Sequence, residues 1–223
     1  MILAIDIGNT DIVIGGFDNG ELVFVSGIST HTKKTEDEYA VALRSVLHLH
    51  DVSDNCVDGA IISSVVPTLN KTVKTALKLA FGVDAIVVGA GVKTGINIHC
   101  DTPSSVGTDI VCAAVASHSI YGYPSVVVDM GTATKILAID DKGTFIGVSI
   151  MPGVNISLRA LVDSTAQLPD ISLEMPRSVI GKNTVDSMRS GVIYGASSMV
   201  DGMIDRFCKE LKGDVKMIAT ASK

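Results

Sequence analysis

The amino-acid sequence predicts an α/β protein built from two similar halves. Short, continuously apolar segments alternate with segments of helical periodicity along the chain, which is typical of mixed α/β folds. The chain has 223 residues, of which 47% are hydrophobic, and this is enough for one large core or two smaller ones. Two stretches of the chain also repeat one pattern. This repeat is the strongest of the three observations.

The repeat relates MILAIDIGNTDIVIGGFDNGELVFVSGI, from Met1, to SVVVDMGTATKILAIDDKGTFIGVSI, from Ser125. In each copy an apolar strand meets D-x-G, a second strand follows, and a D-x-G hairpin turn leads to a third strand. The matched positions, at one constant offset, are Asp6 with Asp129, Gly8 with Gly131, Asp18 with Asp141, Gly20 with Gly143 and Ser26 with Ser149. The alternative is two unrelated hairpins that share a common turn sequence. We expect a duplicated β-meander.

The first copy contains a carboxylate at an unusual place. An apolar strand over 2–5 precedes a polar corner over 6–11, and a second strand covers 12–17. Asp6 follows a segment that is typical of a fully buried strand. A buried carboxylate is costly unless it has a partner. Asp6 therefore predicts either a bound cation or a carboxylate that caps neighbouring amides.

Helices and strands are expected to alternate after each meander. Thr35 and Glu38 have the spacing of a capping box, which predicts a helix start. The expected elements are a helix over 35–50, a strand over 58–67, a helix over 68–82 and a strand over 85–89, and, after the second meander, segment 153–166, a helix over 184–212 and a strand over 215–220. We predict an N-terminal domain over 1–117 and a C-terminal domain over 118–223.

Composition excludes several classes of protein. The net charge is −6 and the pI is about 5.3, without a basic stripe, so no nucleic-acid surface is expected. No run of about 18 uncharged apolar residues occurs, so no membrane span is expected. The cysteines (Cys56, Cys100, Cys112 and Cys208) form no C-x-x-C pair. This spacing favours reduced thiols in a cytoplasmic protein over a zinc site or a disulfide framework.

The two D-x-G corners have the chemistry of a phosphate site. Glycine lets a phosphate approach the backbone, and the amides and hydroxyls that follow can donate hydrogen bonds to it. The candidate donors are Asn9, Thr10, Thr132 and Thr134. Asp6 suits Mg²⁺, which accepts one or two carboxylates and keeps its waters. The two corners together favour a nucleotide site over a pair of ordinary turns.

A candidate catalytic base lies in the segment SSVGTDIVCAAVASHSIYG. Gly107 breaks the preceding loop, and Thr108 and Asp109 open a helix. An aspartate at a helix start is most often a cap. Beside a nucleotide site, the same carboxylate could accept the proton of a hydroxyl that attacks the γ-phosphate.

The chain resembles the type III pantothenate kinases in the motifs DIGNT, DEYA, ISSVVP, GVKTG, VGTD, DMGTAT, MPG and IGKNTVDSMRSG, which occur in that order. The resemblance extends from Met1 to Thr220. These enzymes belong to the superfamily of acetate and sugar kinases, Hsp70 and actin. The resemblance implies two duplicated actin-like (ribonuclease H-like) domains around a nucleotide cleft. It also implies ATP-dependent phosphorylation of pantothenate to 4'-phosphopantothenate, the first step of coenzyme A biosynthesis.

The resemblance also implies roles for individual residues. The ATP phosphates would be bound by Asp6, Ile7, Gly8, Asn9, Thr10, Asp11, Ile12 and Val13, and Thr132 would contact ATP. Asp109 would be the catalytic base, and pantothenate would lie along Cys100, Gly107, Thr108, Asp109, Ile110 and Thr184. Asp129 would bind a monovalent cation, K⁺ or NH₄⁺, and Asp6 would hold Mg²⁺ directly or through water. A homodimer is expected.

The sequence departs from the family pattern mainly around pantothenate. Ile110 stands where the family usually has arginine, which suits the carboxylate of pantothenate. Cys100 replaces a tyrosine, Asp11 replaces an asparagine, and Lys135 stands where threonine is frequent. The chain reads IATASK where the family continues A-T-G-G, so the second domain is expected to be truncated at its end.

These departures leave more than one function open. An active pantothenate kinase is the first hypothesis. The alternatives are a catalytically weak or inactive paralogue, either a kinase for another hydroxyl substrate that lacks the carboxylate, or a nucleotide-binding regulatory protein. The aspartate at position 109 favours catalysis, because a chain without turnover has no chemical need for it.

Overall fold

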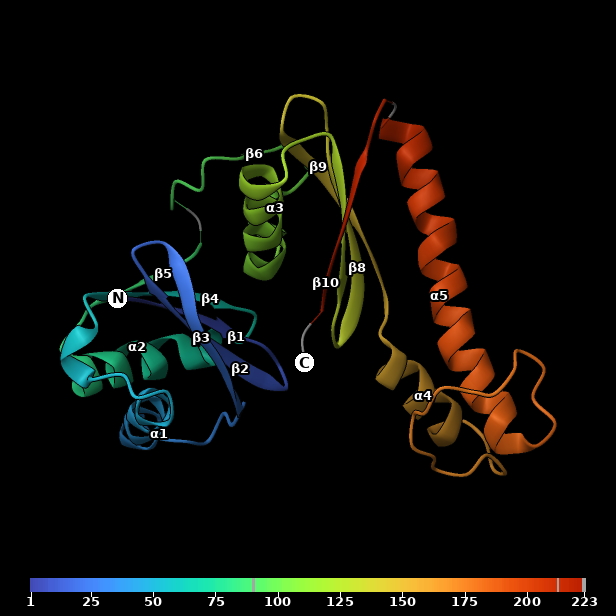
Figure 1. Cartoon of the computed structure of the whole chain (residues 1–223), viewed down its shortest axis with the longest axis horizontal. Coiled ribbons are helices and arrows are strands. Elements are labelled where there is room, and N and C mark those ends of the chain that lie inside the picture. The colour runs from blue at the N-terminus through green and yellow to red at the C-terminus, as the bar shows by residue number, and fades with distance from the viewer. Residues whose placement is uncertain (90, 212, 222–223) are drawn as a thin grey trace. The chain divides into compact units, whose positions relative to one another are not determined.

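The computed structural model describes residues 1–89, 91–211 and 213–221 (Figure 1). The chain divides into two compact units. Unit 1 comprises Met1–Thr94 and Ser104–Cys112, and unit 2 comprises Gly95–Pro103 and Ala113–Lys223. The predicted end of the long helix at Lys212 and the last two residues of the chain lie outside the described residues. The predicted division between 117 and 118 remains a proposal.

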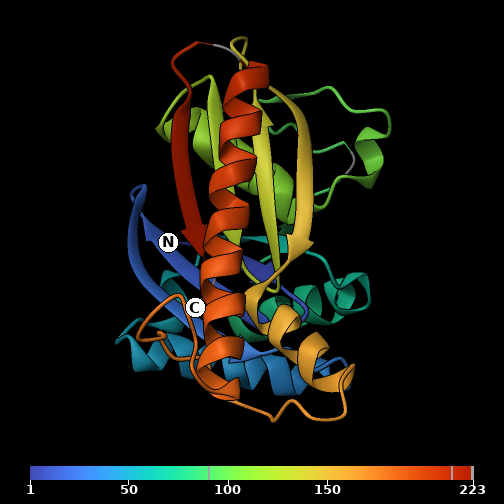
Figure 2. The same cartoon turned by 90° about the vertical axis from the view of Figure 1, so that its right-hand side faces the viewer.

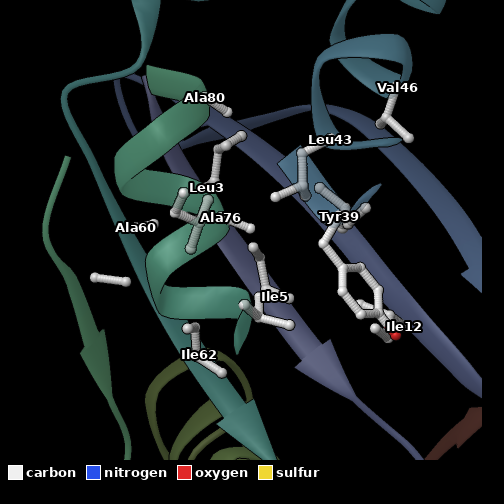
Figure 3. Packing of buried hydrophobic residues seen from close by; sticks show 14 of the residues in the cluster. Leu3, Ile5, Ile12, Tyr39, Leu43, Val46, Ala60, Ile62, Ala76 and Ala80 are labelled. Atoms are coloured by element: carbon white, nitrogen blue, oxygen red, sulfur yellow. The ribbon is translucent and has the colours of Figure 1, made fainter. Parts of the chain in front are cut away.

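Unit 1 is a five-stranded mixed sheet with helices packed on it. Its strands are β1 (Ile2–Ile7), β2 (Asp11–Asp18), β3 (Glu21–Ser29), β4 (Gly59–Ser64) and β5 (Ala85–Val87), in the order β3-β2-β1-β4-β5. The helices are α1 (Glu36–Leu49) and α2 (Pro67–Phe81), with a short 3₁₀ turn, η1 (Asp54–Cys56). Side chains of α1 and α2 meet those of β1, β2 and β4 in one continuous apolar core (Figure 3).

Both helices of unit 1 begin or end at the residues that the sequence indicated. The Thr35 side chain accepts a hydrogen bond from the Glu38 amide (3.3 Å), and the Glu38 carboxylate accepts one from the Thr35 amide (2.8 Å). This confirms the predicted capping box. Gly82 ends α2 with φ of 75°, a left-handed conformation that glycine adopts without steric cost.

Unit 2 contains a second five-stranded sheet. Its strands are β6 (Asn97–Ile98), β7 (Ser125–Met130), β8 (Ala133–Ile139), β9 (Thr144–Pro152) and β10 (Lys216–Ala221), in the order β10-β7-β8-β9-β6. The helices are α3 (Thr108–Ile120), which starts in unit 1, α4 (Val154–Asp163) and α5 (Thr184–Leu211), and η2 (Pro103–Ser105) is a 3₁₀ turn. The two views show α5 on one face of this sheet and α3 on the other (Figures 1 and 2).

The two sheets have the same core topology, which confirms the predicted duplication. β1–β2–β3 and β7–β8–β9 are antiparallel meanders, and a later strand pairs in parallel with the first strand of each: β4 with β1, and β10 with β7. The register shift between the second and third strands recurs as well. It leaves Val23 unpaired in β3 and Ile146 unpaired in β9, which are equivalent positions of the repeat.

The two meanders differ in the lengths of the two connections that flank the middle strand. Ile7 pairs with Ile12 across the first corner, whereas Met130 pairs with Thr134 across the second, so the second corner is one residue shorter. The following hairpin turn is one residue longer. The Asp140 carboxylate, not that of the sequence-matched Asp141, accepts from the amides of Lys142 (3.0 Å) and Thr144 (2.8 Å). A constant sequence offset therefore misplaces this middle strand.

None of the helices in the described part of the chain combines the length and the apolar character that a membrane-spanning helix requires.

Candidate active site

The corner between β1 and β2 is fixed by backbone and hydroxyl hydrogen bonds. The Gly8 amide donates to the Asp11 carbonyl (2.9 Å). Thr30, directly after β3, donates its amide to the Thr10 carbonyl (2.8 Å) and its hydroxyl to the Gly8 carbonyl (2.7 Å). A rigid corner of this kind presents its remaining polar groups in one arrangement, as a phosphate site requires.

Asp6 lies at this corner, but not in the buried position that the sequence suggested. Its side chain is exposed, because β1 buries Ile5 and Ile7 on the face opposite to Asp6. The expectation of a buried Asp6 was therefore wrong. An exposed carboxylate is hydrated, so the stability of the fold does not demand a cation at Asp6. Any role of Asp6 in metal binding therefore depends on the groups around it.

Thr108 fixes the start of α3 against the end of β4. Its hydroxyl accepts from the Ser64 amide (2.9 Å), donates to the Ser64 carbonyl (3.0 Å), and lies 3.3 Å from the Ser63 hydroxyl. These contacts link the chain across more than forty residues and hold the next residue, Asp109, in the first turn of the helix. The Thr108 hydroxyl thus positions Asp109; its predicted contact with pantothenate stays a prediction.

Ser63 connects the strand that carries Asp6 to the start of the helix that carries Asp109. Burial is the largest cause that raises the pKa of Cys112, and the negative charges of Asp6 and Asp109 raise it further, while a hydrogen bond with Ser63 acts in the opposite direction. Asp6 on β1 pairs across the sheet with Ser63 on β4, and the Ser63 hydroxyl lies 3.3 Å from that of Thr108, the residue before Asp109. The end of β1 and the start of α3 therefore place two acidic groups in one part of unit 1.

A pocket of about 350 Å³ lies beside the first corner, within unit 1. It is lined by Asn9, Thr30, His31, Thr32, Lys33 and Val66. The Thr32 hydroxyl, the Asn9 amide and the Lys33 ammonium can donate hydrogen bonds to phosphate oxygens, whereas the Thr30 hydroxyl already donates to the Gly8 carbonyl. Sequence reasoning selected Asn9 but missed the lining residues from Thr30 to Lys33. The repeat could have indicated Thr30, because Thr30 directly follows β3 at the position where Gly153 follows β9 in the second copy.

The second corner, between β7 and β8, is closed in the same way. The Gly131 amide donates to the Ala133 carbonyl (3.2 Å), and the Gly153 amide donates to the Thr132 carbonyl (3.2 Å). Thr132 itself is exposed at this corner. A β-carbon at Gly153 would overlap the carbonyl oxygens of Gly131 and Thr132. The backbone of the corner can therefore approach this position only because residue 153 is glycine.

We expect Gly153→Ala to displace the second corner. Gly153 has φ of −70°, which alanine tolerates, so the effect comes from overlap with backbone atoms that cannot rotate away. The expected losses are about 1–3 kcal/mol in the free energy of unfolding, together with weaker nucleotide binding. Denaturant unfolding and calorimetry measure them. Gly191→Ala on α5, where a β-carbon meets open space, is the control; an equal loss there would contradict this account.

Asp129, at the end of β7, forms an ion pair. Its Oδ2 lies 2.6 Å from Lys135 Nζ, and both side chains are mostly shielded from solvent. The family resemblance implied a monovalent cation at Asp129, and the sequence analysis did not predict this ion pair. The Lys135 ammonium already contacts the carboxylate that an alkali cation would need as a ligand. This residue set does not fit a separately bound K⁺ or NH₄⁺.

The remaining predicted substrate residues differ in environment. Ile110 is only 6% exposed, and Gly107 precedes the helix start. Cys100 is half-buried in the segment after β6, and Thr184 is the exposed first residue of α5. The residues from Asp6 to Val13 and from Gly107 to Ile110 belong to unit 1, whereas Cys100, Asp129, Thr132 and Thr184 belong to unit 2.

Gly107 leaves room for the Asp109 carboxylate. A β-carbon at Gly107 would overlap Asp109 Oδ1. We expect Gly107→Ala to move this carboxylate and to lower kcat for the phosphorylation proposed below by about ten- to hundredfold. Steady-state kinetics test this, with circular dichroism to show that the fold is kept. Gly89→Ala, in the same unit and facing open space, should leave kcat unchanged; an unchanged kcat in Gly107→Ala would show that Asp109 tolerates the displacement.

The family model for type III pantothenate kinase matches residues 2–206. The chain belongs to this family. A type III pantothenate kinase from Halalkalibacterium halodurans is 42% identical over 220 residues, covering 99% of this chain and 87% of the relative. These findings confirm the family that the motifs indicated, and the chain is a member of the type III pantothenate kinases over almost its full length.

Solved structures support the fold of this type III pantothenate kinase family member. A protein from Campylobacter jejuni described as a conserved Baf family transcriptional activator has a TM-score of 0.54 at 16% identity, covering 98% of this chain and 90% of the other. A 2-dehydro-3-deoxygalactonokinase protein from Sinorhizobium meliloti has a TM-score of 0.54 at 13% identity, covering 98% and 91%. At these identities the likeness shows the fold alone.

The donor set at the first corner fits a metal that arrives with a nucleotide. Among the described residues, no group of three or more His, Cys, Asp or Glu side chains is arranged to hold a metal ion. Mg²⁺ in kinases is usually held by one or two carboxylates together with substrate phosphates and water. Asp6 can supply that small protein share, and Asp109 follows Thr108, whose hydroxyl lies 3.3 Å from that of Ser63, the cross-strand partner of Asp6.

Proposed function

We propose that this chain phosphorylates pantothenate with ATP, forming 4'-phosphopantothenate in the first step of coenzyme A biosynthesis. Membership of the type III pantothenate kinase family supports the reaction. The observation that carries the mechanism is that Ser63, the cross-strand partner of Asp6, has its hydroxyl 3.3 Å from that of Thr108, the residue before Asp109. It brings the residue proposed to face the metal-bound phosphates near the residue proposed to deprotonate the acceptor.

Asp109 is proposed as the general base. Its carboxylate accepts the proton of the primary hydroxyl of pantothenate as the hydroxyl oxygen attacks the γ-phosphorus. The bond from the γ-phosphorus to the bridging oxygen of ATP breaks, and ADP leaves with that oxygen. Thr108, held by Ser64, keeps the base in place during this step.

The glycine corners are proposed to bind the ATP phosphates. The stretch from Asp6 to Val13 supplies the first corner, with Thr132 at the second. The pocket beside Asn9 adds the Lys33 ammonium and the Thr32 hydroxyl. Amide, hydroxyl and ammonium donors stabilise the charge that develops on the transferred phosphoryl group. Asp6 would hold Mg²⁺, directly or through water, and the metal would offset the negative charge of the phosphates.

The pantothenate end is where this chain differs from its family. Cys100, Gly107, Ile110 and Thr184 are the proposed lining residues. Ile110 is buried and offers no donor for a carboxylate. This observation favours a second candidate function, phosphorylation of a related primary alcohol that lacks the carboxylate. A non-catalytic regulatory protein is the third candidate, and Asp109 argues against it.

Product analysis separates these candidates. The protein is incubated with Mg-ATP and either pantothenate or the corresponding neutral amide, and the products are identified by mass spectrometry. Pantothenate kinase activity predicts the mass of one added phosphoryl group and a higher kcat/KM for pantothenate than for the amide. A higher kcat/KM for the amide would support the second candidate. No phosphorylated product from either alcohol would contradict both.

A homodimer in the cytoplasm completes the proposal. The dimer comes from the resemblance to the family, and light scattering at several protein concentrations tests it. The cytoplasm is proposed from the spacing of the four cysteines, which favours reduced thiols.

A further inference from the structure

The Asp129–Lys135 pair is built into the sheet of unit 2. Asp129 on β7 and Lys135 on β8 are direct cross-strand partners, so their side chains leave the sheet on the same face. Lys135 Nζ lies 2.6 Å from Asp129 Oδ2, and the two side chains are only 16% and 19% exposed. A shielded pair at this distance interacts more strongly than one in open solvent.

The equivalent position in the first copy carries no charge. Asp6 on β1 pairs across the ladder with Val13 on β2, while Asp129 pairs with Lys135. The two corners therefore share a carboxylate at the end of the first strand but differ in its cross-strand partner. An exposed Asp6 opposite an apolar side chain suits a metal that arrives with ATP. At Asp129, the chain itself supplies a cation, the Lys135 ammonium.

We infer that the Lys135 ammonium takes the place of a monovalent cation at Asp129, so that this enzyme requires neither K⁺ nor NH₄⁺. The effect on turnover rests on the proposed function. The replacement of the cation by Lys135 rests on the geometry of the Asp129–Lys135 pair alone. Lys135 neutralises Asp129 two residues from the corner that contains Gly131 and Thr132. Without this neutralisation, the carboxylate would repel the phosphates of a nucleotide bound there.

An alkali cation would compete poorly for this carboxylate. When bound there, the alkali cation would lose some of its hydration water in exchange for protein oxygens. It would also place a second positive charge beside the Lys135 ammonium. Lys135 cannot diffuse away, because its backbone is held in the centre of the sheet between β7 and β9. The covalently attached cation is therefore present at any salt composition.

The test compares cations at equal ionic strength. ADP release with pantothenate and calorimetric affinity for Mg-ADP are measured in potassium, ammonium, sodium and choline chloride. The wild type should vary by less than about twofold across the four salts, since its cation is part of the chain. Lys135→Thr should lose about tenfold or more in sodium and choline and regain it in potassium or ammonium, because the uncompensated Asp129 then needs a cation.

The control is Lys142→Thr, which removes a charge from the exposed hairpin turn of the same sheet. It should behave like the wild type in every salt. Stimulation of the wild type by potassium of about tenfold or more would overturn the inference whether or not Lys135→Thr folds. So would a folded Lys135→Thr protein without cation dependence, because the ion pair would then be purely structural.

The two readouts separate this inference from the proposed function. Absence of pantothenate-dependent turnover in every salt would contradict the kinase, but the affinity for Mg-ADP would still decide the inference. Wild-type affinity that is equal in the four salts, with potassium-dependent affinity in Lys135→Thr, supports it. Wild-type affinity that requires potassium overturns it.

Discussion

Replacing Asp109 by asparagine should lower kcat for pantothenate phosphorylation by about 10²- to 10⁴-fold, the usual contribution of a general base. Asparagine has nearly the same shape and can still begin a helix, so α3 and its link from Thr108 to Ser64 are kept. The amide cannot accept the proton of the attacking hydroxyl. Steady-state kinetics measure the loss, and calorimetry should show that the affinity for Mg-ADP is retained.

Asp141→Asn is the matched control for this substitution. It makes the same chemical change at an exposed position of the β8–β9 turn, where Asp140, not Asp141, binds the turn amides. It should leave kcat unchanged. A fully folded Asp109→Asn protein that keeps most of its kcat would show that another group, or the substrate itself, removes the proton.

The largest expected effect on stability is that of Leu77→Ala. Leu77 is fully buried between α2 and the sheet of unit 1, within the core that includes Leu3, Ile5 and Leu43. Truncation removes apolar contacts and leaves a cavity that rigid neighbours fill incompletely. We expect a loss of about 2–5 kcal/mol in the free energy of unfolding. Denaturant-induced unfolding, followed by circular dichroism, measures it.

Leu79→Ala provides a control on the same helix. Leu79 is 53% exposed, so its truncation should change stability by less than about 0.5 kcal/mol. Equal losses for the two variants would mean that α2 does not pack on the sheet through the face that carries Leu77.

Features that depend on local pattern were predictable from the sequence. The two meanders, the capping box at Thr35 and the helix end at Gly82 each follow from residues close together in the chain. The predicted base, Asp109, lies in the first turn of a helix as expected, and the repeat of Asp6 and Asp129 corresponds to equivalent strands. In these cases residue spacing alone determines the local geometry.

Features that depend on register or on solvent exposure were not predictable in this way. A corner that is one residue shorter makes Lys135 the cross-strand partner of Asp129, and a constant offset along the sequence cannot show this. Asp6 is exposed because one face of the unit 1 sheet holds the helices and its side chain lies on the other. Lys33 joins the pocket beside Asn9 only through the path of the chain after β3.

Phosphoryl transfer from ATP to pantothenate is tested by measuring ADP release from Mg-ATP with and without pantothenate. We expect release that depends on pantothenate and that falls to background in Asp109→Asn. ADP release that is the same with and without pantothenate, from a protein that still binds nucleotide, would contradict it.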